Sequence, residues 1–370
     1  MKKEFDKKER LLSLDTLRGF DMLFIMGLAG LIIAICKLFP SSGFAGWLSA
    51  QMGHVEWNGL AHHDTIFPLF LFIAGISFPF SIAKQQASGK KGKQIYLKII
   101  KRGIVLVLLG LVYNGIFRLD FENLRCASVL GRIGLAWMFA ALLFINFKTK
   151  ALGVIAAVIL MGYWLLLWLI PGGPDTYSVE NNFAGMVDRV ILPGKLYVNN
   201  NFDPEGLFST LPAIVTAILG MFTGQFVRLS SKKVSENRKV VYMLIAACGF
   251  LVIGLLWNYV FPINKNLWSS SFVCVLAAYS LFLFAIFYYI IDVKGYRKWT
   301  FFFRVVGMNS ITIYLAQRII NFSQISRFFF GGVAGKCPEV WANIINATGF
   351  IVVSWLFLYF LYKKNVFLKV

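Results

Sequence analysis

The sequence predicts an all-α protein that crosses a membrane many times. Of its 370 residues, 58% are hydrophobic and only 15% are charged, and the mean hydropathy is +0.69. Apolar runs recur at about 20 residues, the length with which an α-helix crosses the hydrocarbon core of a bilayer. These runs are continuously apolar rather than alternating, which argues against a β-barrel. Because lipid offers no hydrogen-bonding partners, helices must satisfy their own backbone groups.

About ten transmembrane helices are expected, in a single domain over residues 1–370. The apolar runs are Phe20–Phe39, Thr65–Ala83, Gly103–Phe117, Ala127–Ile145, Ala151–Ile170, Leu207–Val227, Val240–Phe261, Phe272–Ile291, Phe301–Ile320 and Trp341–Tyr362. Residues 1–19 form an N-terminal segment before the first run, and residues 171–206 form the longest loop. The first run is too long for a cleaved signal peptide and is expected to stay as an anchor. No clear broken helix or inverted repeat is evident.

The distribution of basic residues predicts the orientation of the chain. The formal net charge is +20. Loops on the side of the N-terminus carry 27 Lys and Arg residues, loops on the other side carry 8, and Arg132 and Arg318 lie inside spans. Such a bias places both termini in the cytoplasm and the loop 171–206 outside. The charge is therefore explained by topology and by anionic lipid headgroups, and no nucleic-acid partner is expected.

The five cysteines indicate neither disulfides nor a metal site. They are odd in number, scattered along the chain and without a CxxC spacing. No metal is expected.

The segment before the second span holds all three histidines of the chain. His54 is followed by His62, His63 and Asp64 within ten residues, at a predicted membrane boundary. Histidine titrates nearest neutral pH and suits proton transfer, although a lone interfacial histidine is more often bonded to backbone or water. Adjacent histidines on a helix diverge, so a metal site is disfavoured. Asp64 is equally suited to capping the next helix and to catalysis.

Charged residues at the inner end and within the spans allow two interpretations each. Asp15 and Arg18 are either an i, i+3 ion pair or a phosphate anchor, because Arg grips phosphate bidentately. Arg132 lies between Gly131 and Gly134, where it either forms a structural ion pair or faces a ligand. On the outer side, Asn258 and Lys265 offer donors for sugar hydroxyls or a carbonyl oxygen, and the alternative is a solvated turn.

Taken in order, these residues resemble the heparan-α-glucosaminide N-acetyltransferase family and, more broadly, the transmembrane acyltransferase superfamily. The matching motifs cover nearly the whole chain: Ser13-x-Asp15-Thr16-x-Arg18-Gly19, His54-x-x-Trp57-Asn58-Gly59-Leu60-x-x-x-Asp64-x-x-Phe67-Pro68, Val129-Leu130-Gly131-Arg132, Asp203-Pro204-Glu205-Gly206-Leu207, Asn264-Lys265-Asn266-Leu267-Trp268 and Gly307-Met308-Asn309-Ser310-Ile311. One departure is Gly131, where relatives usually have Gln.

The resemblance implies transfer of an acetyl group from cytoplasmic acetyl-CoA to the amine of a glucosamine-type sugar on the outer side. It implies a bacterial inner-membrane enzyme whose catalytic histidine is His54, acting as general base or through an acetyl-histidine. The other residues expected to contribute are Asp64 in catalysis, Asp15, Arg18, Lys101, Arg102, Arg132 and Asn309 at acetyl-CoA, and Trp57, Asn58, Asn258, Lys265 and Trp268 at the sugar.

Two other classes of function stay open. A sugar or amino-sugar transporter without acyl transfer is the alternative, and it would be favoured by broken helices and inverted repeats. A purely structural membrane protein fits least, because polar residues gather in the outer loops. Monomer and homodimer are both compatible with the sequence.

Overall fold

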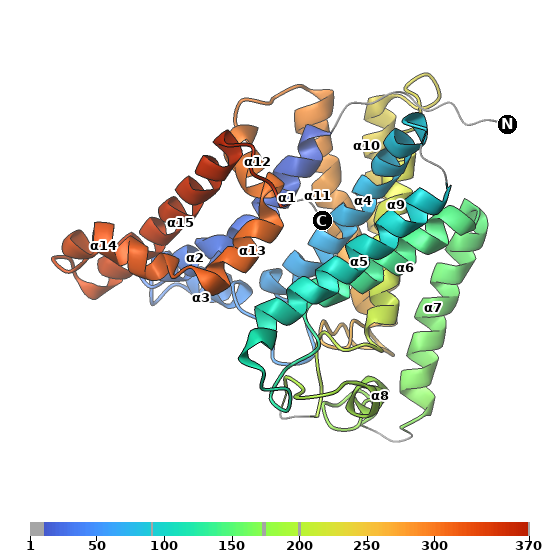
Figure 1. Cartoon of the computed structure of the whole chain (residues 1–370), viewed down its shortest axis with the longest axis horizontal. Helices are drawn as coiled ribbons and strands as arrows, with labels where there is room; N and C mark the ends of the chain where they lie inside the picture. The colour runs from blue at the N-terminus through green and yellow to red at the C-terminus, as the bar shows by residue number, and fades with distance from the viewer. Residues whose placement is uncertain (1–10, 90–91, 172–174, 199–200, 369–370) are drawn as a thin grey trace.

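The computed structural model describes residues 11–89, 92–171, 175–198 and 201–368, which form the bundle of helices in Figure 1. Within this part of the chain no β-strand occurs, and the extended pairing is limited to isolated bridges of Arg125 with Gly194 and of Val198 with Phe202. Eight of the described helical segments are long and apolar enough to cross a membrane. The predicted class, an all-α polytopic membrane protein, is confirmed.

The helices follow one another with few long connections. Their bounds are α1 (Leu12–Leu23), the π-helical η1 (Phe24–Leu28), α2 (Ala29–Cys36), α3 (Gly43–Gln51), the 3-10 turn η2 (His62–Thr65), α4 (Ile66–Ala87), α5 (Gly92–Asn114), the 3-10 turn η3 (Ile116–Arg118), α6 (Val129–Asn146), α7 (Thr149–Leu169), α8 (Phe183–Ile191), α9 (Thr210–Val227), α10 (Glu236–Trp257), α11 (Ser270–Tyr288), the π-helical η4 (Tyr289–Val293), α12 (Thr300–Met308), α13 (Ser310–Ile319), α14 (Phe322–Ala334) and α15 (Glu339–Lys363).

Eight of the ten expected spans coincide with the eight apolar segments. The other two, the third and the ninth, are not among these segments. The third expected span lies in α5, which begins at Gly92 rather than Gly103 and therefore carries basic residues in its first half. The ninth is divided at Asn309 into α12 and α13.

The expectation that no helix is clearly broken is wrong at two points. In the first span, Gly27 has φ 124°, a conformation open to glycine but costly for other residues. In the ninth, Asn309 has φ −121° and ψ 22°, outside the helical region. An interrupted helix at membrane depth is tolerated only inside protein or beside a cavity.

The first helix begins eight residues earlier than predicted, at Leu12 instead of Phe20. Close packing against α12 explains the difference. A Cβ added at Gly19 would lie 1.8 Å from the carbonyl oxygen of Phe303, and one added at Gly307 would lie 2.0 Å from that of Asp15. Two glycines thus bring the backbones together, and residues 12–19 belong to the bundle. Residues 1–10 of the expected N-terminal segment lie outside the described residues.

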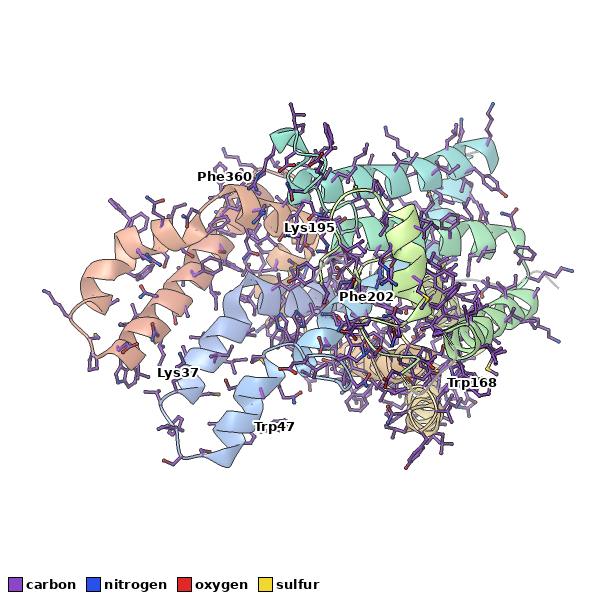
Figure 2. All side chains as sticks on the ribbon, turned by 90° about the horizontal axis from the view of Figure 1, so that it is seen from below. Lys37, Trp47, Trp168, Lys195, Phe202 and Phe360 are labelled. Atoms are coloured by element: carbon purple, nitrogen blue, oxygen red, sulfur yellow. The ribbon has the colours of Figure 1, made fainter. Side chains whose placement is uncertain are left out.

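Helices α4 and α9 form the centre of the bundle, and α15 its periphery. The apolar window of α9 is 72% buried by protein and that of α15 only 17%. Figure 1 places α8 at one end of the bundle, opposite the end at which α1 begins. Seen from that end in Figure 2, Phe202 lies over the body of the molecule, while Lys37 and Trp47 project on the α2–α3 hairpin.

The long loop 171–206 is more ordered than its turn-rich sequence suggests, because it contains α8. Its residues 172–174 and 199–200, which belong to the Pro171-Gly172-Gly173-Pro174 and Asn199-Asn200-Asn201 runs, lie outside the described part of the chain.

Candidate active site

The loop before α4 folds around the carboxylate of Asp64. Asp64 lies in the 3-10 turn that precedes α4, and its Oδ2 accepts hydrogen bonds from the backbone N–H groups of Ala61 at 3.2 Å and Val55 at 3.3 Å. The expected N-cap of the helix from Thr65 onward is not formed: Asp64 is the third residue of the turn and bonds back to the Ala61 N–H that begins it, and α4 has no side-chain cap. This backward cap occupies one carboxylate oxygen and leaves the other for a second task.

That second oxygen bonds to His54. The distance between His54 Nδ1 and Asp64 Oδ1 is 2.6 Å, typical of a charge-assisted bond. The Asp64 side chain is 1% exposed, whereas that of His54 is 55% exposed. A buried carboxylate therefore orients a histidine whose other face is open to solvent.

Lys265 completes a cluster of three charged or titratable groups. Its Nζ lies 3.3 Å from Asp64 Oδ1 and 3.0 Å from His54 Nδ1. The shorter His54–Asp64 bond assigns the Nδ1 proton to His54, because an unprotonated Nδ1 would repel the carboxylate at that distance. Lys265 then donates to Asp64, and His54 Nε2 is left as a proton acceptor.

His63 and His62 continue from this cluster toward the protein interior. The rings of His54 and His63 lie 4.7 Å apart, edge to face. The His62 ring packs 4.4 Å from that of Phe24. In both residues the Nδ1 atom is buried without a hydrogen-bond partner. Within the described residues, no group of three His, Cys, Asp or Glu side chains could hold a metal ion.

The loop after α10 is joined to the His54 loop by three hydrogen bonds. Asn264 Nδ2 donates to Asn58 Oδ1 at 3.0 Å, and Gly59 N donates to the Ile263 carbonyl at 2.8 Å. Asn266 Nδ2 reaches the carbonyl of Glu56 at 3.4 Å. These bonds hold Lys265 beside Asp64, although the two residues are far apart in sequence.

Three of the residues expected at the sugar have structural partners. Trp57 Nε1 donates to the Tyr177 carbonyl at 2.8 Å, and its ring meets Phe202 at 5.3 Å. Asn258 is exposed and accepts from Ile263 N at 2.8 Å. The structure does not bring Trp268 to the surface. The Trp268 side chain is 1% exposed and packs behind the site. The backbone of Trp268 is in the left-handed region.

Arg132, in α6, is buried beside the turn that precedes α9. It donates to the Gly206 carbonyl at 3.2 Å and to Ser209 Oγ, and its guanidinium carbon lies 5.1 Å from the centre of the Trp268 ring. Its Nε and Nη1 atoms are buried without partners. These contacts fix the turn before α9, and the two remaining donors are free to meet a ligand.

A second buried network fastens the long loop to the chain before α6. Arg125 donates to Asp203 Oδ2 at 2.7 Å and Oδ1 at 2.6 Å, and to Glu205. Nearby, burial raises the pKa of the Asp188 carboxyl to about 6. The hydrogen bonds that this carboxyl accepts from the backbone N–H groups of Leu207 and Phe208 act in the opposite direction, because they favour its charged form. Sequence reasoning named neither Arg125 nor Asp188, although the first stands just before the fourth expected span.

At the opposite end, basic side chains converge between α1, α4 and α5. Arg18 pairs with Asp15 at 3.5 Å and donates to Ser77 Oγ at 3.1 Å. Arg102 lies close enough to Arg18 for their charges to interact, stacks 4.2 Å from the Trp137 ring and has a buried Nε without a partner. Two cations held together favour an anion between them. Lys101 is exposed on another face of α5 and is not brought into this group.

Between the two ends lies a small cavity of about 40 Å³ among α1, α4, α6 and α13. Ser310, beside the break at Asn309, contributes to its wall, and Asn309 has a buried Oδ1 without a partner. Asp21 of α1, which sequence reasoning missed, is also among the residues that line the cavity. The available signal was an acidic residue one position inside the first predicted span.

Together, fold and site describe a polytopic membrane protein with a histidine–carboxylate pair at one end and an arginine pair at the other. Residues 10–124 match the family model described as "Domain of unknown function (DUF5009)". The chain is 26% identical over 419 residues to the heparan-alpha-glucosaminide N-acetyltransferase of Homo sapiens, covering 98% of this chain and 60% of that protein. It is also 26% identical over 375 residues to the Mus musculus protein of the same name, covering 86% of this chain and 56% of that protein. The resemblance inferred from the motifs is confirmed. The chain spans about three fifths of the length of these relatives.

Proposed function

We propose that the protein is a transmembrane N-acetyltransferase that moves an acetyl group from cytoplasmic acetyl-CoA to the amine of a glucosamine-type sugar on the outer side. The observation that carries the proposal is the 2.6 Å bond from a buried Asp64 to an exposed His54. The names of the two relatives support the class of reaction.

His54 acts as the general base. An amine attacks a thioester only when it is neutral and loses a proton as the new bond forms. His54 Nε2 takes that proton, and the carboxylate of Asp64 stabilises the resulting imidazolium. A histidine so oriented is also a competent nucleophile, so an acetyl-His54 intermediate is the rival route.

Lys265 is suited to the oxyanion of the tetrahedral intermediate. Its ammonium stands beside His54, and its side chain is 15% exposed, so a carbonyl oxygen can approach it. A cation already in place requires no reorganisation when negative charge develops. Asn58 and Asn258, both exposed on this side, are proposed to bind sugar hydroxyls, with Trp57 and Trp268 as the packed wall behind them.

The donor is proposed to enter from the cytoplasm. Arg18 and Arg102, with Asp15 positioning Arg18, would bind its phosphates, and Lys101 would contribute only long-range charge. The thioester arm would pass Asn309 toward Arg132, whose unpaired donors face the interior. This orientation follows the positive-inside bias, and we propose a bacterial plasma membrane as its location.

The test is acetyl transfer by purified protein. Labelled acetyl-CoA is offered with glucosamine to the wild type, to His54→Ala and to Glu56→Gln, whose exposed carboxylate lies two residues from His54. The expected result is N-acetylglucosamine from the wild type and Glu56→Gln but not from His54→Ala. An active His54→Ala would refute the central role of His54. Acetyl-CoA binding without product would redirect the proposal to another acceptor.

A transporter for the same class of sugar is the second candidate. The breaks at Gly27 and Asn309 favour it, because transporters bind substrates at interrupted helices. Sugar uptake into vesicles without acetyl-CoA would support it, and the absence of both acetyl transfer and acetyl-CoA binding would make it the better explanation.

A further inference from the structure

A second cavity, of about 410 Å³, lies between α13, α15 and the segment that follows α15. Nine of its ten lining residues are apolar, and the tenth is Thr312. Its walls are a face of α13 that includes Leu315 and Ala316, the last turns of α15 at Phe357 and Leu361, and residues 366–368. None of the lining residues belongs to the candidate active site, so the proposed chemistry leaves this cavity without a role.

The chain reverses direction directly after α15 and so forms the third wall. Asn365 has φ 54°, and the backbone N–H of Val366 donates to the carbonyl of Leu361 at 2.9 Å, as in the Schellman motif that ends many helices. The ring of Phe367 lies 6.2 Å from that of Tyr362. The segment therefore folds back against the end of α15 and encloses one end of the cavity.

The cavity is open on the side that a bilayer would cover. Ile319 is 78% exposed and Val366 54%, and the apolar window of α15 is only 17% buried by protein. Figure 1 shows α13 and α15 on the side of the bundle opposite α7 and α10. An apolar cavity does not hold ordered water, and lining atoms without neighbours lose dispersion contacts. In a membrane, the material available to fill such a space is the hydrocarbon of lipid.

The size of the cavity suits one acyl chain. A methylene group is comparable in size to a water molecule, whose share of liquid volume is roughly 30 Å³, so the cavity has room for on the order of a dozen methylenes. Three walls surround this space, whereas an ordinary lipid-facing helix offers only one. A chain that enters it is therefore retained more strongly than the lipid around it.

Two lysines lie in the turn that joins two walls of the cavity. Lys363 ends α15 and Lys364 follows it, and both are exposed between the lining residues Leu361 and Val366. No salt bridge among the described residues involves either lysine. In the predicted orientation this turn lies at the cytoplasmic leaflet, where basic residues next to a membrane helix attract anionic headgroups.

Helix α13 separates this cavity from the small one in the bundle. Ser310, Ile311 and Tyr314 line the small cavity, whereas Leu315 and Ala316 are among those that line the larger one. Because successive residues of an α-helix turn by about 100°, the two sets lie on roughly opposite faces. A ten-residue helix that begins after the break at residue 309 thus has a cavity on each side. A ligand in the larger cavity supplies packing that the protein does not.

We propose that the larger cavity binds one acyl chain of an anionic phospholipid from the cytoplasmic leaflet, with Lys363 and Lys364 at its phosphate. The chain packs against the outer face of α13, and the segment 366–368 covers its end. This site is separate from the acetyl-transfer chemistry, so it stands or falls independently of the proposed function.

The first experiment identifies the occupant by photochemical labelling. The protein is reconstituted into phosphatidylcholine vesicles that contain a small fraction of phosphatidylglycerol with a diazirine in one acyl chain. After illumination, labelled peptides are sequenced by mass spectrometry. Labelling should be concentrated on α13, the end of α15 and residues 366–368, well above that of α7. Equal labelling of α7 and α13 would mean that only bulk lipid is present and would overturn the proposal.

The cavity itself is tested by Ala316→Phe, which places a ring in its wall. Overpacking of this kind should lower the labelling of α13, relative to α7 in the same sample, by about tenfold. Ala157→Phe adds the same ring to an exposed position of α7 and should leave the labelling of α13 unchanged. Undiminished labelling in folded Ala316→Phe would exclude the cavity as the binding site. Crosslinks between the cavities of two copies, without lipid, would show that a second copy closes it instead.

The headgroup is tested without altering the cavity. Each lysine near an anionic surface contributes about fivefold to binding, so the double variant Lys363→Gln, Lys364→Gln should reduce labelling by phosphatidylglycerol about 10–30-fold. The matched pair Lys148→Gln, Lys150→Gln removes two exposed lysines between α6 and α7 and should have little effect. A diazirine phosphatidylcholine should label the wild-type cavity weakly. Equal labelling by the two lipids, or none lost in the double variant, would refute the anionic headgroup.

Discussion

Asp64→Asn tests the candidate active site most directly, because the two oxygens of Asp64 serve different partners. Oδ2 accepts from two backbone N–H groups, and Oδ1 meets His54 and Lys265. An asparagine has only one acceptor oxygen, so it cannot serve both sides. If its amide faces His54, the Nδ1 proton must move to Nε2, and the base is lost.

If the amide instead faces the backbone, the cap is lost. Two backbone donors are then left opposite an N–H group, at a cost of about 1–3 kcal/mol in the free energy of unfolding. In either orientation the buried negative charge that stabilises the imidazolium is gone. A carboxylate in this position is worth about 10⁴-fold in the serine-protease triad, so a fall in kcat of about 10²–10⁴-fold is expected, or roughly 3–5 kcal/mol of barrier.

The assay is the initial rate of acetyl transfer with saturating acetyl-CoA and sugar, combined with a thermal unfolding curve in detergent. Glu56→Gln is the matched control, since it removes an exposed carboxylate of the same loop. A variant with wild-type kcat would refute the reasoning that Asp64 orients and stabilises His54. A loss of rate that is fully accounted for by unfolded protein would reduce Asp64 to its capping role.

Three further predictions follow from the buried charges. Arg125→Met removes the cation that pairs with the buried Asp203 and the partly buried Glu205, and should cost about 3–5 kcal/mol of unfolding free energy, measured by denaturation against the exposed control Arg118→Met. The pKa of Asp188 is about 6 in the folded protein, against 3.8 in the unfolded chain, so the native state keeps this proton to higher pH. The free energy of unfolding should therefore fall by up to about 3 kcal/mol as the pH rises from about 4 to 6, and then level off. Melting curves across that range should show the decline in the wild type and lose it in Asp188→Asn. Arg102→Met should weaken acetyl-CoA binding about 10–100-fold in titration calorimetry, whereas Lys101→Met should change it little; equal losses would contradict the phosphate role of Arg102.

The fold class was predictable because it depends on local hydrophobicity alone. Continuous apolar runs of sufficient length mark helices in lipid whatever their neighbours are. The boundaries were less predictable. The first helix begins at Leu12 because Gly19 and Gly307 let α1 and α12 touch, a tertiary contact that no local pattern reveals.

The candidate site was predictable only in part. His54 and Asp64 stood out as titratable residues in an apolar chain, but helical spacing did not pair them. Their contact depends on the non-helical loop that closes around Asp64. The residue pattern drew attention to Lys265 as a donor, but its placement beside Asp64 depends on hydrogen bonds between two distant loops. Asp21 was identifiable from its position and was overlooked.

The pairing of the His54 loop with the Lys265 loop has a consequence for biosynthesis. The two segments leave the ribosome about two hundred residues apart, and the bonds from Asn264 to Asn58 and from Gly59 to Ile263 link them. During synthesis, His54 and Asp64 are therefore made long before their lysine partner. We expect a nascent chain that ends within α10 to carry a histidine–aspartate pair without Lys265, and to become competent for the reaction only after the loop that follows α10 has been made.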